Sequence, residues 1–314
     1  MNFLKLIRWQ NLIIIAVTQY FVRYFLIEPF YNLQKIALQM SNLDFFLLVL
    51  TIVLLAGAGY IINDIFDIQI DGINKPDKMI IGNLITEKKA NMVYYVMNGI
   101  AIFIGMYLGI KVGSLSLGFS FIVCIAFFYF YSLKYKRLFL WGNFVVAFLT
   151  AFLLIIVWLF EFFAIRKNGI VFTEGIQAYW TITYFVLAYA LFAFLISLIR
   201  EFVKDIEDLE GDSKWGCTTL PVVIGVDKAK KIASILSFLG VFLIGFFQIK
   251  LKNVNLGYFA GILMIVVQVP FVYLGIKIWS AKEKADFHFT SNLSKIIMVL
   301  GILTMFAVFY SLQS

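Results

Sequence analysis

The sequence predicts an all-α, polytopic membrane protein with about nine transmembrane helices, and three features of its composition lead to that fold class. Of its 314 residues, 62% are hydrophobic, and the mean hydropathy is +0.94. A soluble domain holds about 45–50% apolar residues, and one core of this size has no room for the surplus. Only 14% of the residues are charged, against about 25% in soluble domains. The bilayer is therefore the expected solvent.

Nine segments are long and apolar enough to cross a bilayer, which requires ~20 mostly apolar residues. The expected spans cover residues 10–27, 45–62, 90–110, 113–133, 142–162, 179–199, 232–249, 256–279 and 292–312. The short link at Lys111–Val112–Gly113 predicts that the third and fourth spans form an antiparallel hairpin. Some loops are themselves apolar, so counts of eight or ten spans stay open.

The basic residues predict the orientation of these spans. With nine spans, 19 of the 26 Lys and Arg residues fall on the same side of the membrane as the N-terminus. The positive-inside rule places that side, with the long loops near residues 63–89 and 200–231, in the cytoplasm. We therefore expect a multi-pass protein of the cell (inner) membrane. The net charge of +8 is attributed to loops that meet anionic lipid headgroups, and no nucleic-acid partner is expected.

Both long cytoplasmic loops begin with acidic clusters that topology does not require. Each cluster has three aspartates spaced three and then four residues apart: Asp64, Asp67 and Asp71 in the first array, and Asp205, Asp208 and Asp212 in the second array. On one helix this spacing gathers three carboxylates within an arc of about 60°. Such charges repel one another, and Mg²⁺, which binds one or two carboxylates plus substrate phosphates, offsets the repulsion. Two such faces across a cavity would hold a diphosphate; solvated helix ends paired with lysines are the alternative.

These clusters resemble the two signatures of the UbiA superfamily of intramembrane prenyltransferases. The matching motifs are Asn63-Asp64-x-x-Asp67-x-x-x-Asp71, and Asp208-x-x-x-Asp212 preceded by Lys204-Asp205. Further stretches that agree are Tyr131-Ser132-Leu133-Lys134 followed by Arg137, Gly142-Asn143, and Arg8 with Asn11, although Trp9 stands where the family usually has proline. The resemblance covers nearly the whole chain. It implies a single UbiA-like domain over residues 1–314, with nine helices around a central cavity and an active site facing the cytoplasm.

The resemblance also implies roles for individual residues. The implied catalytic residues are Asp64, Asp67, Asp71, Asp208, Asp212 and Tyr131. The implied ligands of the cofactor, Mg²⁺, are Asp64, Asp67, Asp71, Asp205, Asp208 and Asp212. The diphosphate would be bound by Asn63, Lys134, Arg137, Lys204, Asn11 and Arg8, with Asn63 either a ligand itself or the group that orients Asp67. His288, the one histidine, is expected on the surface, in a polar loop before the last span.

Two stretches narrow the expected reaction. Residues 71–76 and 200–212 resemble the branch of the family that moves geranylgeranyl from its diphosphate to geranylgeranylglycerol phosphate; the chlorophyll and tocopherol branches share part of the pattern, and Lys78-Met79 replaces the usual Arg-Pro. The expected activity is Mg²⁺-dependent transfer from a prenyl diphosphate donor to a lipid-soluble acceptor. An aromatic, quinone-precursor prenyltransferase is the alternative, and a haem farnesyltransferase fits less well. A divalent-cation transporter is a distant alternative, because transporters hold their ions near the bilayer midplane.

Overall fold

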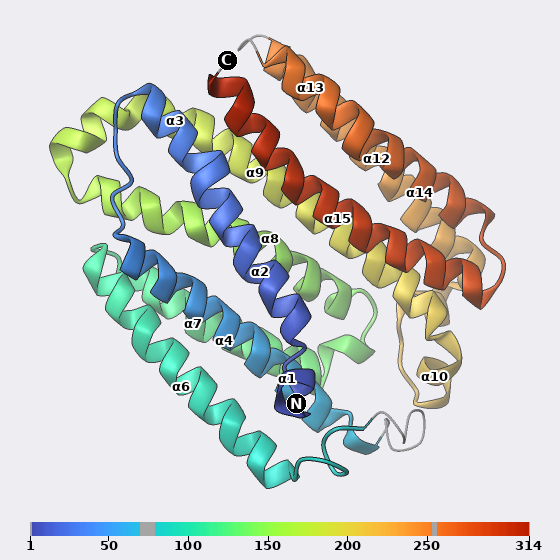
Figure 1. Cartoon of the computed structure of the whole chain (residues 1–314). Coiled ribbons are helices and arrows are strands. Elements are labelled where there is room, and N and C mark those ends of the chain that lie inside the picture. Colours follow the sequence, from blue (N-terminus) through green and yellow to red (C-terminus); the bar gives the residue numbers. More distant parts are fainter. Residues whose placement is uncertain (1, 70–78, 253–255, 314) are drawn as a thin grey trace. The chain divides into compact units, whose positions relative to one another are not determined.

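The computed structural model describes residues 2–69, 79–252 and 256–313, and the regular elements in these ranges are helices (Figure 1). Among the described residues, nine helical segments are long and apolar enough to cross a membrane: Trp9–Leu33, Asn42–Phe66, Glu87–Lys111, Leu115–Leu133, Trp141–Arg166, Ala178–Glu207, Val226–Ile249, Gly257–Ser280 and Lys284–Leu312. The predicted count of nine spans is confirmed. The last helix begins at Lys284 rather than at residue 292, because its polar first turns continue the same helix.

The chain falls into two compact units. Unit 1 comprises Met1–Tyr20, Ile36–Tyr135 and Ile156–Ile176, and unit 2 comprises Phe21–Lys35, Lys136–Ile155 and Gln177–Ser314. Two long helices, α8 (Trp141–Arg166) and α9 (Gly169–Glu207), contribute residues to both units. The first acidic array belongs to unit 1 and the second to unit 2.

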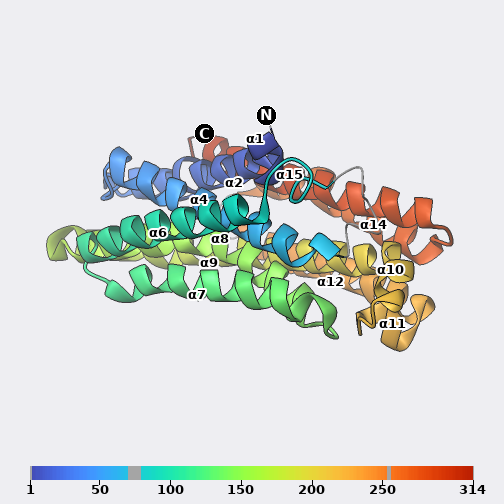
Figure 2. The same ribbon diagram turned by 90° about the horizontal axis from the view of Figure 1, so that it is seen from below.

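Unit 1 is built on three helices that pack on one another (Figures 1 and 2): α4 (Asn42–Phe66), α6 (Glu87–Lys111) and α7 (Leu115–Leu133). The short α1 (Asn2–Leu6) and the helix α2 (Trp9–Phe21) precede them. The predicted hairpin of α6 and α7 is present, and it turns at Gly113 with φ of +77°, which glycine adopts without strain. Gly109 lets the two backbones approach, since a Cβ there would lie 2.8 Å from the Gly118 nitrogen.

Capping and one ion pair fix the end of α4 that lies opposite the acidic array. The Ser41 hydroxyl accepts a hydrogen bond from the Asp44 N–H at 3.1 Å and so caps the first turn. The ammonium of Lys111, the last residue of α6, donates to the Asp44 carboxylate at 2.8 Å. These contacts set the register of α4 against α6 within unit 1.

Unit 2 contains the C-terminal helices, in which α12 (Val226–Lys252) packs against α14 (Val269–Ser280) and α14 packs against α15 (Lys284–Gln313) (Figure 2). Its shorter elements are α3 (Glu28–Leu33), the 3₁₀ turn η3 (Tyr135–Arg137, which begins in unit 1), α10 (Leu209–Lys214), α11 (Leu220–Ile224) and α13 (Gly257–Leu263). Two π-helical turns, η1 (Val22–Ile27) and η4 (Met264–Gln268), each directly precede a helix with proline in its first turn, α3 with Pro29 and α14 with Pro270. Proline has no N–H to donate to the carbonyl four residues earlier, so the ladder of backbone hydrogen bonds is interrupted there. Each π-helical turn lies next to such an interruption.

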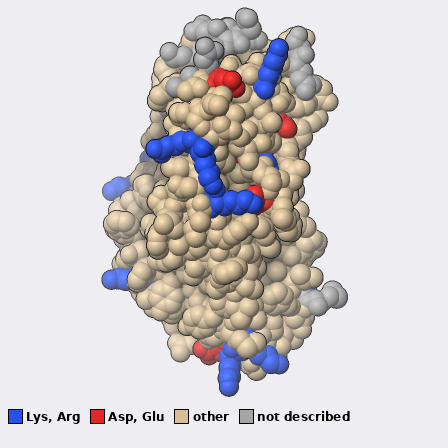
Figure 3. Space-filling view, turned by 90° about the vertical axis from the view of Figure 1, so that its left-hand side faces the viewer, with Lys and Arg blue, Asp and Glu red and all other residues tan. Residues whose placement is uncertain are grey.

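Large apolar side chains point outward as well as inward. On α6, Phe103 is 78% exposed, Tyr95 67% and Ile110 63%. The face drawn in Figure 3 carries few charged side chains, and most of its described surface is uncharged. A helix that is apolar on its outer face needs lipid or protein around it, which agrees with a helix that spans a membrane.

Candidate functional site

The first acidic array lies at the C-terminal end of α4. The helix ends at Phe66, and Asp67 follows as its C-cap with φ of −95° and ψ of −2°. The Asp67 N–H donates to the Asn63 carbonyl at 3.1 Å, and the Asn63 amide donates to the Asp67 carboxylate at 3.0 Å. The predicted contact between Asn63 and Asp67 is therefore present. Asp71, the third predicted ligand of this array, lies outside the described residues.

Residues from the start of the chain meet this array within unit 1. The Arg8 guanidinium contacts the Asp64 carboxylate at 2.9 Å and lies over the Tyr60 ring, 4.7 Å from its centroid. The Asn11 amide donates to the Tyr60 hydroxyl at 3.2 Å. The structure thus brings two predicted phosphate-binding residues, Arg8 and Asn11, to the predicted metal ligand Asp64, with Tyr60 as the group that links them.

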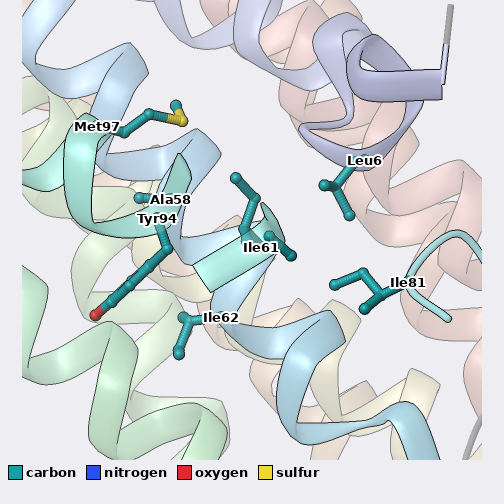
Figure 4. Close-up of a cluster of buried hydrophobic side chains, with 8 residues drawn as sticks. Leu6, Ala58, Ile61, Ile62, Ile81, Tyr94 and Met97 are labelled. Carbon is teal, nitrogen blue, oxygen red and sulfur yellow. The ribbon is translucent and has the colours of Figure 1, made fainter. Parts of the chain in front are cut away.

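A buried apolar cluster holds the end of α4 in place (Figure 4). Its members come from α1, α4, α6 and the segment before α6: Leu6, Ala58, Ile61, Ile62, Ile81, Ala90, Tyr94 and Met97. Ile61 and Ile62 directly precede Asn63 and Asp64 in the sequence. Fully burying one such side chain stabilises the fold by about 1.5–3 kcal/mol. The packing that buries Ile61 and Ile62 therefore also fixes the carboxylates that follow them.

The second array lies where α9 ends and α10 begins. Asp205, in the last turn of α9, accepts a hydrogen bond from the Asn143 amide of α8 at 2.8 Å. Asp208 stands between the two helices with φ of −94° and ψ of 5°. Its N–H donates to the Lys204 carbonyl at 2.9 Å.

Asp212, in α10, is held by the turn that follows it. Its carboxylate accepts a hydrogen bond from the Thr219 hydroxyl at 3.1 Å, and its carbonyl accepts one from the Cys217 N–H at 3.0 Å. The neighbouring Thr218 is tied to η3, because its N–H donates to the Arg137 carbonyl at 2.8 Å. Arg137 therefore belongs structurally to the second array within unit 2.

The other predicted residues are divided between the two units. Tyr131 is in the last turn of α7 and the exposed Lys134 is its C-cap, both in unit 1. Lys204, in unit 2, lies within electrostatic range of Asp205 and Asp212.

The expectation that an array lies on one continuous helix face is wrong at the middle aspartate of the second array, whereas in the first array the third aspartate, Asp71, lies outside the described residues. An α-helix is interrupted at Asp67 in the first array and at Asp208 in the second. Three carboxylates within one arc repel one another along an unbroken helix. In the second array the helix boundary at Asp208 falls between the first and the third of these carboxylates.

The electrostatics of the second array favour a cation. Burial raises the pKa of Asp212 above the ordinary value of an aspartate, and the neighbouring Asp208 raises it further, against the lowering effects of the Thr219 hydrogen bond and of Lys204. The charged form of Asp212 is therefore costly until a positive group comes near.

The donor set fits a hard divalent ion that completes its shell from elsewhere. Among residues 2–69, 79–252 and 256–313, no three His, Cys, Asp or Glu side chains converge closely enough to hold a metal by themselves. Mg²⁺ needs no such cage, because it keeps several waters and takes one or two carboxylates plus phosphate oxygens. Asp64, Asp67, Asp205, Asp208 and Asp212 offer carboxylate oxygens of that kind.

Sequence reasoning gave no site role to three residues that contact the arrays or the side chains beside them, although Asn143 belongs to a stretch that resembles the family. Asn143 gave a usable signal, since an amide in the first turn of an apolar span is costly unless it has a partner. Tyr60 gave none, because its contact with Asn11 joins segments far apart in the chain. Thr219 follows Asp212 by seven residues, and its contact depends on the turn after α10, which the sequence pattern does not specify. His288 lies within α15 rather than in a loop; it is on the surface as predicted, yet its Nδ1 lies 2.9 Å from the Glu207 carboxylate.

Comparison with known proteins places these arrays in a family. A family model described as the UbiA prenyltransferase family matches residues 36–296. Digeranylgeranylglyceryl phosphate synthase of Pyrococcus horikoshii is 33% identical over 79% of this chain and 80% of its own length. The enzyme of the same name from Saccharolobus solfataricus is 34% identical over 72% of each chain.

Solved structures share the fold. A structure of digeranylgeranylglyceryl phosphate synthase has a TM-score of 0.65 at 23% identity and covers 100% of this chain and 98% of that one. A UbiA homologue from Archaeoglobus fulgidus bound to DMAPP and Mg²⁺ has a TM-score of 0.59 at 13% identity, over 97% of this chain and 99% of its own. With the sequence matches and the two acidic arrays, these findings show that the chain belongs to the UbiA prenyltransferase family.

Proposed function

We propose that this multi-pass membrane protein transfers a geranylgeranyl group from its diphosphate to a hydroxyl of geranylgeranylglycerol phosphate, with Mg²⁺ as cofactor. The observation that best supports this proposal is the pair of acidic arrays with matched spacing. In each array the helix is interrupted at the middle aspartate, and each array has basic residues beside it. Relatives at 33% and 34% identity bear the name of that synthase. We further propose that residues 1–314 act as one prenyltransferase domain, in the inner membrane, with both arrays on the cytoplasmic side.

The carboxylates are proposed to anchor the donor through the metal. Asp64 and Asp67 of unit 1, and Asp205, Asp208 and Asp212 of unit 2, are the proposed ligands, together with Asp71. Mg²⁺, when bound, neutralises the charge that grows on the departing diphosphate. Asn63 and Asn143 orient two of these carboxylates, Asp67 and Asp205, by the hydrogen bonds described above.

Basic side chains are proposed to bind the phosphate oxygens directly. Arg8 is preformed for this role, because Asp64 and the Tyr60 ring hold its guanidinium in place. Lys134, Arg137 and Lys204 supply further charge-assisted hydrogen bonds, which are stronger than neutral ones. Such groups accelerate the reaction when they bind the leaving group more strongly as its charge develops.

The transfer step exchanges one bond to carbon for another. The C1–O bond to the diphosphate breaks and its electron pair leaves with the diphosphate. The acceptor hydroxyl oxygen forms the new ether bond to C1, and its proton is released. Tyr131 is proposed to face the allylic carbon, where an aromatic ring steadies developing positive charge. The surrounding apolar helices keep water away from that carbon.

A direct assay tests the proposal. The purified protein is incubated with geranylgeranyl diphosphate, Mg²⁺ and either geranylgeranylglycerol phosphate or 4-hydroxybenzoate, and the products are identified by mass spectrometry. A diether phosphate that disappears on adding EDTA is the expected product. A prenylated aromatic product would instead assign the protein to quinone-type metabolism, and metal-independent product would contradict the role given to the arrays.

A further inference from the structure

A cavity lies among α9, α12, α14 and α15, and every residue that lines it belongs to unit 2. Its volume is about 270 Å³. On α9 the lining extends from Tyr184 to Leu195, and on α12 it extends from Gly240 to Phe247. None of the carboxylates of the two acidic arrays lines it. We call it the unit 2 cavity.

Two glycines and two aromatic rings shape the inner wall of the unit 2 cavity. A Cβ at Gly240 would lie 2.5 Å from the Phe271 ring, and a Cβ at Gly301 would lie 2.4 Å from the Phe192 ring. The two rings lie against each other, with centroids 5.6 Å apart. Each ring therefore takes the place that a side chain would occupy on the facing helix, which fixes the position of this wall.

The lining offers no unused polar side chain deep in the cavity. Three lining side chains carry a polar atom, those of Tyr184, Tyr189 and Thr304, and none is charged. The Thr304 hydroxyl donates to the Gly301 carbonyl at 2.6 Å, so it accepts the hydrogen bond of the Tyr189 hydroxyl at 2.9 Å. Tyr184 is 41% exposed and is not part of the deep wall. The cavity therefore suits a hydrocarbon ligand, because a polar one would lose its hydrogen bonds to water there.

The cavity lies at a depth that the tails of lipids occupy. The spanning part of α9 extends from Ala178 to Glu207, and the lining lies about 9 Å from the first of these ends and about 18 Å from the second. A hydrocarbon core of about 30 Å, centred on this span, contains the whole lining of α9. Leu187 and Leu191 line the cavity and are 51% and 45% exposed. The mouth of the cavity is therefore open at bilayer depth.

The dimensions of the cavity match one hydrocarbon chain. The α9 lining from Tyr184 to Leu195 covers about 16 Å of helix. A volume of about 270 Å³ over that length gives a mean cross-section of about 17 Å². Carbon atoms in contact lie about 4 Å apart, so a single chain fills a cross-section of about 13 Å². Two chains side by side, or a fused-ring molecule, would not fit.

We propose that the unit 2 cavity binds a single hydrocarbon chain of a bilayer lipid, at a site separate from the reaction. Water does not fill an apolar cavity, and an empty one loses the dispersion contacts of its walls. A lipid chain restores those contacts and joins α9, α12, α14 and α15. The nearest α9 lining residue, Leu195, precedes Asp205 by ten residues, or about 15 Å of helix, which separates the bound chain from the second array.

Labelling with a photoactivatable lipid tests the proposal. Full-length protein is placed in nanodiscs with phosphatidylglycerol that carries a diazirine near the end of one chain, and the labelled residues are mapped by mass spectrometry. Label is expected on the lining residues of α9 and α12. Phe103 of α6, which is 78% exposed, reports the lipids that only surround the protein. Probes with a straight fatty acyl chain and with a methyl-branched isoprenoid chain are compared, and their relative yields identify the kind of chain that the cavity takes.

A variant that fills the cavity is expected to exclude the chain. Ala188→Phe places a ring in the cavity from α9, and the label there should fall about tenfold, because the loss of two buried methylene groups already has that effect. Label at Phe103 should stay unchanged. Ala193→Phe, at a half-buried residue of the same helix outside the lining, is the matched control. Added phosphatidylglycerol should raise the melting temperature of the wild type more than that of Ala188→Phe, because the bound chain stabilises only the folded protein.

Two outcomes with wild-type protein, which need no variant, would overturn the inference. One is label in the lining that does not exceed the level at Phe103. The other is removal of the label by geranylgeranyl diphosphate with Mg²⁺, which would assign the cavity to the prenyl chain of the donor. An equal loss of label at Phe103 and in the lining of Ala188→Phe would also contradict the inference. Labelling itself is measured without substrate, so the result does not depend on whether transfer occurs.

Discussion

Asp67 and Asp208 occupy the same position in the two acidic arrays and have nearly the same backbone conformation, with φ and ψ of −95° and −2° at Asp67 and of −94° and 5° at Asp208. At both residues the N–H still donates to the carbonyl four positions earlier, that of Asn63 or Lys204. The two arrays therefore share the same backbone conformation and the same backbone hydrogen bond at the middle aspartate. The two middle aspartates are equivalent positions, and their variants are expected to behave alike.

Replacing either middle aspartate is expected to remove transfer without unfolding the protein. Asp67→Ala and Asp208→Ala each delete a proposed metal ligand, and kcat/KM should fall by about 100-fold or more. Neither side chain is in the apolar core, so the melting temperature in detergent should stay close to that of the wild type. If both ligands serve one reaction, the double variant should lose little more than either single one. Wild-type turnover in either variant would refute the two-array mechanism.

Asn143 is expected to control metal affinity through Asp205. Asn143→Ala removes the amide that orients the carboxylate, and loss of such a supporting partner typically costs 10–100-fold in metal affinity or activity. The Mg²⁺ concentration for half-maximal activity should rise by about that factor. Asn91→Ala is the control, because that amide bonds to the Glu87 carbonyl of its own helix and to no acidic array among the described residues. Equal Mg²⁺ dependence of both variants and the wild type would show that Asn143 has no such role.

Arg8 is expected to affect donor binding. Arg8→Gln removes the ion pair with Asp64 and the contact with the Tyr60 ring, and KM for the prenyl diphosphate should rise roughly tenfold. Arg8→Lys should recover only part of this loss, because lysine lacks the planar fork that matches phosphate oxygens. Lys5→Gln, one turn earlier in the chain, serves as the charge control. Steady-state kinetics with varied donor measure all three, and an unchanged donor KM in Arg8→Gln would contradict the assignment.

The α6–α7 hairpin offers a prediction of stability. A Cβ at Gly109 would lie 2.8 Å from the backbone nitrogen of Gly118, which has no side-chain freedom to move aside. Gly109→Leu should therefore destabilise the fold by about 1–3 kcal/mol, as overpacking does. A Cβ at Gly99, in the same helix, would meet nothing within 4 Å, so Gly99→Leu should leave stability almost unchanged. Thermal melts of the two variants in one detergent compare them directly.

The spans and the arrays could be predicted from the sequence because both depend on local pattern. Apolar runs of about twenty residues fix the spans, and the repeated spacing around Asp67 and Asp208 identifies the arrays. The partners of these carboxylates could not be predicted. The contact of Asn143 with Asp205 and that of Arg8 with Asp64 join segments more than fifty residues apart, and no local pattern encodes them.

The helix breaks and the helical position of His288 also escaped prediction. A spacing of three and four residues is compatible with an unbroken helix. The residue types around Asp208 do not distinguish an unbroken helix from one that is interrupted there. The polar residues near His288 were assigned to a loop because they interrupt the apolar run. They are helical because side chains such as Asn292 find partners along one helix face.

The π-helical turns η1 and η4 give the first and eighth spans a tolerance for changes in length that the other spans lack. A π turn holds one residue more than the α-helical path requires. Deleting one residue within Val22–Ile27 would convert η1 to a regular turn and leave the flanking helix largely in phase. The same deletion in α4 would rotate everything beyond it by about 100° and carry Asp64 away from Arg8. Insertions and deletions among natural variants of this chain should therefore gather at the two π turns and be absent from α4.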